Sequence, residues 1–390
     1  MEKDLAFLRE LPARQQPDWG NPQVVEEVRD ELARRPALVT FEDVRTLRGL
    51  LARAAAGEVQ IVQSGDCAED PAECTSGYVA RKSGLLDALA GVMRMSTHKP
   101  VLRVGRMAGQ FGKPRSSPTE VVDGVELPVY RGHMVNSPEP DPERRRPDPR
   151  RMLAGHDAAR RAVEYLGWTG GERARRVAPP VWTSHEALLL DYEIPQVHRD
   201  PDGRPVLTST HWPWIGERTR QPDGAHVALL AHVANPAACK VGPAMEPDEL
   251  LALCARLDPA REPGRLTLIA RMGAGAVAER LPALVTAVRE AGHPVVWLTD
   301  PMHGNTVCTA EGFKTRLVET VTHEIAEFQR AVYGAGGVPG GLHLETTPDD
   351  VSECAADEDA LSRVGDKYTS FCDPRLNPRQ ALTVAGAWQV

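Results

Sequence analysis

The sequence lacks a basic surplus and any long apolar run. Its 390 residues include 46 Lys and Arg against 54 Asp and Glu, which gives a formal charge of −8. A chain without a basic surplus is not expected to bind nucleic acid. No apolar run approaches the roughly 20 residues that a membrane-spanning helix needs, so we expect no membrane association.

A cysteine framework is also missing. The seven cysteines are odd in number, lie far apart and form no C-x-x-C pair, which is typical of free thiols in a reducing compartment. The charged N-terminal stretch MEKDLAFLRE lacks the apolar segment of a secretory signal. We therefore expect a cytoplasmic protein. Hydrophobic residues make up 42% of the chain, which is enough for a large folded core.

What the sequence does contain is a regular alternation of β-rich runs and helical stretches. Two predicted helices, 22–35 and 41–56, lie mainly within residues 1–55, which we interpret as an N-terminal extension to a catalytic domain at 56–390. Helical stretches separate most of the β-rich runs beyond it, among them a predicted helix at 311–332. The eight runs are 59–63, 101–104, 180–184, 206–210, 239–242, 266–270, 295–299 and 341–345. This pattern predicts an α/β protein with a (β/α)8 TIM barrel, and an open doubly wound sheet is the alternative because periodicity cannot show closure.

Cations follow many of these runs directly. Barrel enzymes carry their active sites at the carboxyl ends of the strands, so we expect these side chains to share one mouth. Arginine offers phosphate or carboxylate a planar fork, and lysine offers a point charge. Each cation alone is as well explained by a surface salt bridge, but six at strand ends predict two anionic substrates or one with two anionic ends. The six are Arg106, Lys113, Arg115, Arg218, Lys240 and Arg271.

A second group of residues offers metal donors. Cys67, His303 and Glu345 follow or end β-rich runs, and Asp373 lies in the later CDPRLN segment. A thiolate, an imidazole and two carboxylates suit a divalent first-row metal such as Mn, Co, Fe or Zn better than Mg or Ca. No two of these residues are closely spaced in sequence. The metal site is therefore expected only if a barrel brings distant strand ends together.

Long motifs along the chain are more specific than these patterns. In order, they are QSGDCAE, VGRMAGQFGKPRS, TSHEALLLDYE, WIGERTRQPDGAH, KVGP, RMG, DPMHGNT, GGLHLETTPDDVSEC and CDPRLNPRQAL. Together they resemble the class II 3-deoxy-D-arabino-heptulosonate 7-phosphate (DAHP) synthases from about residue 12 to the end of the chain. The resemblance implies a TIM-barrel enzyme that condenses phosphoenolpyruvate with erythrose 4-phosphate, the first step of the shikimate pathway. It also implies a divalent metal and a homo-oligomer.

The resemblance also implies roles for individual residues. Lys113, Glu217 and His303 correspond to the catalytic residues. The metal ligands would be Cys67, His303, Glu345 and Asp373. The phosphoenolpyruvate-binding set would be Arg106, Glu217, Arg218, Lys240 and Arg271. The erythrose 4-phosphate end would be Lys113, Arg115 and Ser116.

The chain departs from the family pattern in one informative place. The segment between Met152 and Thr183 is short, and longer family members carry helices there that are associated with binding aromatic amino acids. We therefore expect weak or absent inhibition by Phe, Tyr and Trp, as in a short subgroup linked to antibiotic-type pathways. Three alternatives stay open: an aminoDAHP synthase that uses an imino or amino sugar phosphate, a non-catalytic partner of a chorismate-using enzyme, and a zinc hydrolase.

Overall fold

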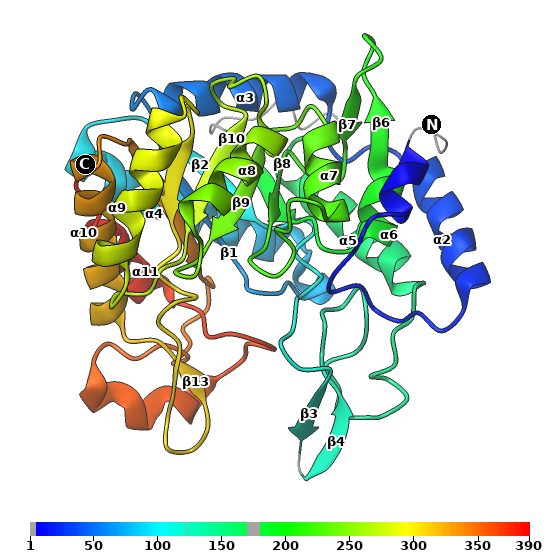
Figure 1. Ribbon diagram of the computed structural model, residues 1–390. Helices are drawn as coiled ribbons and strands as arrows, with labels where there is room; N and C mark the ends of the chain where they lie inside the picture. The colour runs from blue at the N-terminus through cyan, green and yellow to red at the C-terminus, as the bar shows by residue number, and fades with distance from the viewer. Residues whose placement is uncertain (1–4, 123, 170–179) are drawn as a thin grey trace.

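Eight parallel strands close into a barrel in the computed structural model, which describes residues 5–122, 124–169 and 180–390 (Figure 1). The strands, in chain order, are β1 (Gln60–Gly65), β2 (Val101–Arg106), β5 (Trp182–Glu186), β8 (Trp212–Ile215), β9 (Ala237–Val241), β10 (Leu266–Ala270), β11 (Val296–Thr299) and β14 (Pro339–Glu345). β1 pairs in parallel with both β2 and β14, which closes the ring. The predicted barrel is confirmed, and the open-sheet alternative is wrong.

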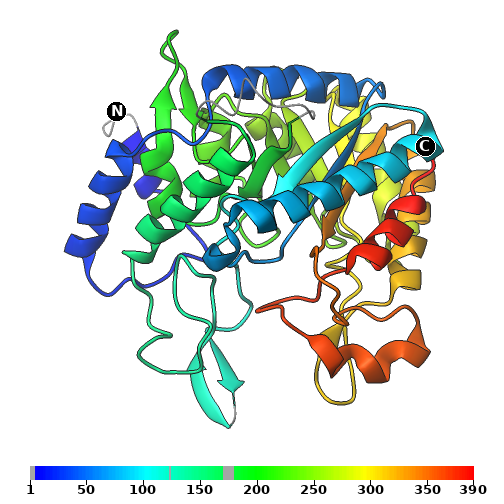
Figure 2. The same cartoon turned by 180° about the vertical axis from the view of Figure 1, so that it is seen from behind.

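Helices cover the outside of the barrel (Figures 1 and 2). They are α4 (Ser76–Thr97), α5 (Arg151–Tyr165), α7 (Ala225–His232), α8 (Pro247–Leu257), α9 (Val277–Glu290), α10 (Val318–Gly334) and α11 (Pro378–Gly386). Local chemistry sets their starts: the Thr75 hydroxyl accepts the Tyr78 N–H at the start of α4, and Pro247 opens α8. No helix in the described ranges is both long enough and apolar enough to cross a membrane.

The connection after β5 differs from the others because it has no long helix. It contains the four-residue α6 (Leu190–Glu193), the 3-10 turn η4 (Ile194–Gln196) and a hairpin of β6 (Val197–Arg199) and β7 (Pro205–Leu207). The N-terminal helix α2 (Pro22–Arg34) packs against α5, α6 and η4. Its buried face of Val25, Val28 and Leu32 thus covers this side of the barrel.

The second N-terminal helix, α3 (Phe41–Ala55), lies across the end of the barrel opposite the hairpin of β3 (Thr119–Val122) and β4 (Val125–Pro128) (Figure 1). A Thr40–Asp43 capping box starts it, and Leu47 and Leu51 are fully buried. Gly264, with φ of +81°, lies so close to α3 that a Cβ would meet the Arg48 carbonyl oxygen at 2.2 Å. Glycine is therefore required where this loop meets the helix.

The fourth predicted run, 206–210, does contain part of a strand, but its predicted place in the barrel is wrong. Val206 and Leu207 pair antiparallel with β6 outside the barrel. The barrel strand is β8, which begins five residues after Leu207. Pro213 lies within β8 and cannot donate to a strand ladder, so the segment does not have the composition expected of a central strand. Because Glu217 and Arg218 follow β8 directly, they still lie at the carboxyl end of the barrel.

Long loops extend from the carboxyl end (Figures 1 and 2). They contain the β3–β4 hairpin (Thr119–Val122, Val125–Pro128), the β12–β13 hairpin (Val307–Cys308, Lys314–Thr315) and two 3-10 elements, η2 (Pro71–Glu73) and η5 (Glu358–Lys367). A further 3-10 turn, η1 (Ala6–Arg9), lies near the N-terminus. The predicted helix at 311–332 therefore begins too early, because α10 starts at Val318. The residues before it form the hairpin, which reaches the candidate site.

Candidate active site

The carboxyl ends of the barrel strands surround a cavity of about 400 Å³. Its lining includes all six cations singled out in the sequence, which come from the ends of β2, β8, β9 and β10 and the loop after β2. Ser116, Glu217, His303 and Asp373 line the same cavity. Residues separated by up to about two thirds of the chain thus meet in one pocket rich in positive charge. The six cations are Arg106, Lys113, Arg115, Arg218, Lys240 and Arg271.

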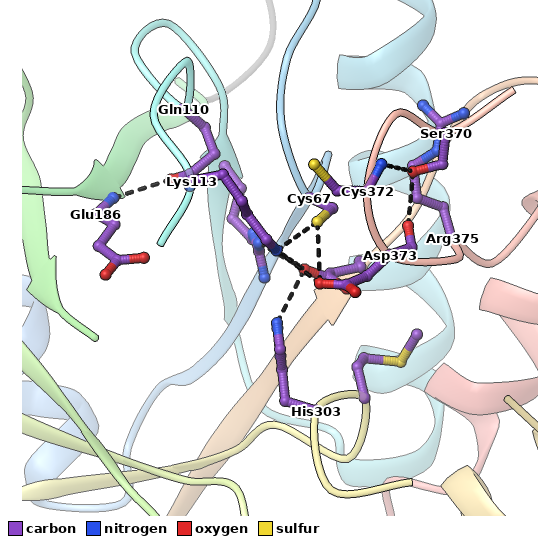
Figure 3. A network of polar contacts seen from close by, with 12 residues as sticks. Cys67, Gln110, Lys113, Glu186, His303, Ser370, Cys372, Asp373 and Arg375 are labelled. Carbon is purple, nitrogen blue, oxygen red and sulfur yellow. Dashed lines mark hydrogen bonds and ion pairs between the residues drawn. The ribbon is translucent and has the colours of Figure 1, made fainter. Parts of the chain in front are cut away.

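Three of the predicted metal donors meet beside this cavity. The Cys67 sulfur and carboxylate oxygens of Glu345 and Asp373 all lie within 4.8 Å of one another. His303 approaches this group through Nε2, which is 3.2 Å from Glu345 Oε1 (Figure 3). Its other ring nitrogen, Nδ1, is 2.7 Å from Asp300 Oδ2. Asp300 therefore turns the imidazole so that Nε2 faces the other three donors, as supporting carboxylates do for metal-binding histidines.

The Lys113 ammonium lies among these donors, so its environment shows how they interact with a positive charge (Figure 3). Its Nζ is 2.5 Å from Cys67 Sγ, 2.7 Å from Asp373 Oδ2 and 3.9 Å from Glu345 Oε1. Burial opposes the charge, but Asp373, Cys67 and Glu345 together raise the pKa of Lys113 well above its ordinary value. The donors therefore converge where a positive charge is stabilised, and their mixed sulfur, nitrogen and oxygen chemistry fits a divalent first-row metal.

Two buried arginines hold Glu345, one from barrel strand β2 and one from the loop between β13 and α10. Arg106 NH2 donates to Glu345 Oε1 at 3.0 Å, and Arg316 NH1 donates to Oε2 at 2.8 Å. Despite complete burial, His303 and Arg316 lower the pKa of Glu345 well below its ordinary value. Glu345 is thus an anion with a fixed orientation. Sequence reasoning missed Arg316, because it fell inside the helix predicted at 311–332.

An ion pair ties together the two loops that carry Cys67 and Asp373. Asp66, next to Cys67, accepts from Arg375 NH1 at 2.8 Å. Arg375 also pairs with Glu353 at 2.8 Å. All three charged groups are buried. Since breaking a buried pair leaves an uncompensated charge, this contact fixes the separation of the two loops.

The cations on the other side of the cavity have different environments. Lys240 forms an ion pair with Asp300, but burial lowers the pKa of Lys240 to about 8. Arg106 lies over the ring of Trp214, with its guanidinium carbon 5.3 Å from the ring centroid. Arg271 NH2 donates to the His303 carbonyl at 3.0 Å. This contact links the loop after β10 to the loop that carries a metal donor.

The mouth of the cavity is formed by loops. Arg115 NH2 is 3.2 Å from Glu120 Oε2, and the Arg115 N–H donates to Gln15 Oε1 at 2.9 Å. Ser116 is exposed and lines the same wall. Lys314, on β13, lines the cavity as well and pairs with Asp373 at 3.2 Å. No sequence signal marked Lys314, because that stretch was predicted to be helical.

Glu186 is another residue that sequence reasoning did not select. It ends β5 inside the TSHEALLLDYE motif and lines the cavity. Its Oε1 is buried and has no hydrogen-bond partner in the part of the chain that the structure describes. Burial raises the pKa of Glu186, although Lys113 and Lys240 oppose the shift. A carboxyl group with a raised pKa and a free oxygen is suited to accepting a proton. Its position at a strand end was the available signal.

Comparisons with known proteins give matches over nearly the whole chain. The model of the class-II DAHP synthetase family matches residues 3–178 and 164–388. A Pseudomonas fluorescens protein described as a probable phospho-2-dehydro-3-deoxyheptonate aldolase is 57% identical over 392 residues, covering 100% of this chain and 98% of the relative. The phospho-2-dehydro-3-deoxyheptonate aldolase of Streptomyces coelicolor is 37% identical, with 97% of this chain and 94% of the relative covered. That of Mycolicibacterium smegmatis is 35% identical, with 96% of this chain and 91% of the relative covered.

Proposed function

This chain belongs to the class-II DAHP synthetase family, and we propose that it condenses phosphoenolpyruvate with erythrose 4-phosphate. The products are DAHP and inorganic phosphate, and the reaction is the first step of the shikimate pathway. One observation carries the proposal: a cluster of metal-type donors lies beside a cavity lined by seven cations, the six predicted ones and Lys314. Two phosphorylated substrates repel each other, so an enzyme that joins them needs such a concentration of positive charge.

We assign a divalent metal to the four donors Cys67, His303, Glu345 and Asp373. The donor chemistry favours Mn, Co, Fe or Zn. When bound, the metal supplies a Lewis acid for the aldehyde oxygen of the acceptor sugar. The residues around it orient its ligands: Asp300 fixes the His303 ring, and Arg106 and Arg316 fix the Glu345 carboxylate. These contacts set the donor positions before the substrates arrive.

Phosphoenolpyruvate is assigned to the side of the cavity nearer the barrel. Arg106, Lys240 and Arg271 lie at the ends of β2, β9 and β10, and Arg218 lies after β8. The Nε atom of Arg106 is buried and has no partner among the described residues. A carboxylate or phosphate oxygen would satisfy it. Substrate binding would therefore relieve an unsatisfied donor that the protein leaves open.

Erythrose 4-phosphate is assigned to the mouth. Arg115, Ser116 and Lys314 would bind its phosphate there, and Lys113 lies between this group and the metal donors. In this arrangement carbon 3 of the enol ester faces the aldehyde carbon and forms the new bond. The cations reduce the repulsion between the two phosphates. Because those around phosphoenolpyruvate are fixed at the ends of barrel strands, they also hold the two substrates with their reacting carbons close together.

A water molecule completes the reaction. Its oxygen bonds to carbon 2, and one of its protons moves to a protein carboxylate, which passes it to the alkoxide formed from the aldehyde. The bond from carbon 2 to the phosphate oxygen then breaks as the carbon 2 hydroxyl becomes the ketone, and the second proton leaves with the phosphate. Glu217 and Glu186 both line the cavity, and each has one buried oxygen without a partner in the described residues. We assign the proton transfer to this pair. Arg220 holds the other oxygen of Glu217 at 2.8 Å, which limits its freedom to turn away.

Phosphate release from phosphoenolpyruvate tests the proposal. We expect release that requires erythrose 4-phosphate, is lost on treatment with EDTA and returns when Mn²⁺ or Co²⁺ is added back. The imino analogue of the sugar phosphate forms a second arm, because an aminoDAHP synthase would prefer it. Hydrolysis of phosphoenolpyruvate without an acceptor, or full activity in EDTA, would contradict the proposal. The homo-oligomer, the cytoplasmic location and a role in secondary metabolism stay predictions.

A further inference from the structure

We propose that Ser184, Gln63 and His343 form a directional hydrogen-bond chain that positions Arg106 for the anionic substrate. None of these three residues belongs to the predicted ligand sets. They lie on β5, β1 and β14, and His343 also lines the cavity. The inference rests on the proposed function, because it assumes that Arg106 binds phosphoenolpyruvate.

The hydrogen-bond chain is continuous and fully buried. Gln63 Nε2 donates to Ser184 Oγ at 2.7 Å, and the Ser184 hydroxyl donates to the Trp212 carbonyl. At the other end, Gln63 Oε1 is 2.6 Å from His343 Nδ1, and His343 Nε2 is 2.8 Å from Arg106 NH1. Gln63, Ser184 and His343 are at most 1% exposed. No solvent therefore competes for these contacts, and each group depends on its neighbour.

The chemistry of the two ends fixes the direction of every bond. Arginine can only donate, so His343 Nε2 must accept from Arg106. Nδ1 must then carry the ring proton and donate it to Gln63 Oε1. The Gln63 amide consequently turns its NH2 group toward Ser184, whose hydroxyl donates onward to the Trp212 carbonyl. If the Gln63 amide were turned the other way, its NH2 group would face His343 Nδ1, which would then have to accept. The ring proton would move to Nε2 and face the N–H of Arg106, which is repulsive.

The hydrogen-bond chain also determines which donors of the Arg106 guanidinium are occupied by protein groups. His343 engages NH1, Glu345 engages NH2 at 3.0 Å, and Trp214 lies against the guanidinium. Trp214 in turn contacts the His343 ring edge-on, with ring centroids 5.3 Å apart. The guanidinium is therefore held on three sides. Its buried Nε has no hydrogen-bond partner in the part of the chain that the structure describes.

Two pairs of variants test the inference by titrating phosphoenolpyruvate into the metal-loaded protein in a calorimeter. Gln63→Met removes the acceptor for His343 without touching Arg106, and we expect the Kd of phosphoenolpyruvate to rise about tenfold. Gln329→Met is the matched control, because Gln329 is a buried glutamine on α10 that bonds to the C-terminal segment. His343→Leu should weaken binding at least as much. His343→Gln should restore it to within about threefold, because its amide oxygen can replace Nε2 as the acceptor.

Steady-state kinetics gives the second readout. We expect the KM for phosphoenolpyruvate to rise in Gln63→Met while the KM for erythrose 4-phosphate stays within about twofold, whereas general loosening of the fold would move both. Unchanged phosphoenolpyruvate affinity in Gln63→Met, or equal losses in both His343 variants, would overturn the inference. A wild-type protein that fails to bind phosphoenolpyruvate would overturn the proposed function and this inference with it. The two failures are therefore distinguishable.

Discussion

The two halves of the cavity are built differently. The deep half contains Arg106, Lys240 and His343, with the metal donors Cys67 and Glu345 beside them. These residues lie on or directly after barrel strands, and their side chains are buried. The mouth, defined by Arg115, Ser116 and Lys314, is formed by the loops beyond the strands. The side chain of Glu345 is 0% exposed, whereas that of Lys314 is 47% exposed.

This difference predicts how each half responds to change. Electrostatic contacts strengthen in a buried site of low polarity, and an unpaired charge there is costly. At the mouth, water and salt weaken the same contacts. Substitutions in the deep half should therefore impair metal binding or phosphoenolpyruvate binding severely. Substitutions at the mouth should have smaller effects, and these effects should depend on salt concentration.

The largest effect should come from Cys67→Ala in the deep half. We expect activity to fall to the background level and metal affinity, measured by competition with a chromophoric chelator, to fall by more than about tenfold. Circular dichroism should show that the chain stays folded. Cys308→Ala is the control, because Cys308 is exposed on β12 and should have no effect. A fully active Cys67→Ala variant would contradict the metal assignment.

Lys314→Ala tests the mouth. The KM for erythrose 4-phosphate should rise about tenfold at low salt, which corresponds to about 1.4 kcal/mol, while the KM for phosphoenolpyruvate changes little. High salt should reduce the difference from the wild type, because screening already weakens an exposed contact. Lys367→Ala, at an exposed lysine on η5, is the matched control. An equal rise in both KM values would remove the proposed division of the cavity.

The pH dependence of phosphoenolpyruvate binding sharpens the comparison. Burial lowers the pKa of Lys240 to about 8, so this cation is charged below that pH and neutral above it. Affinity for the anionic substrate should therefore fall severalfold as the pH rises from about 7 to about 9. Calorimetric titrations in this range measure it. Lys240→Arg, whose guanidinium stays charged, should show a flatter profile, and an identical slope would exclude Lys240 as the cause.

The smallest effect is expected from ligands that bind outside both halves. Tryptophan, phenylalanine and tyrosine at sub-millimolar concentration should leave the rate of phosphate release nearly unchanged. The reason is the short segment between Met152 and Thr183, of which residues 170–179 lie outside the described structure. Strong inhibition by tryptophan would contradict this prediction.

Much of the barrel could be predicted from the sequence because strand patterns and turn residues are local signals. The fourth strand could not be, since Pro213 and two tryptophans give β8 an unusual composition, while the nearby run at 206–210 resembles a strand and forms one outside the barrel. Lys314 and Arg316 were missed for a related reason. Their loop was read as part of a helix, so neither was expected at the cavity.

The sequence by itself determined which charged and metal-binding groups are present and that most of them follow strands. Its motifs also identified the family. Only the tertiary structure decided that a buried oxygen of Glu186 has no partner among the described residues and that burial lowers the pKa of Lys240. It also decided that His343 contacts both Gln63 and Arg106. These properties depend on distances and burial between groups on different strands. Barrel closure sets both, and no local pattern in the chain encodes them.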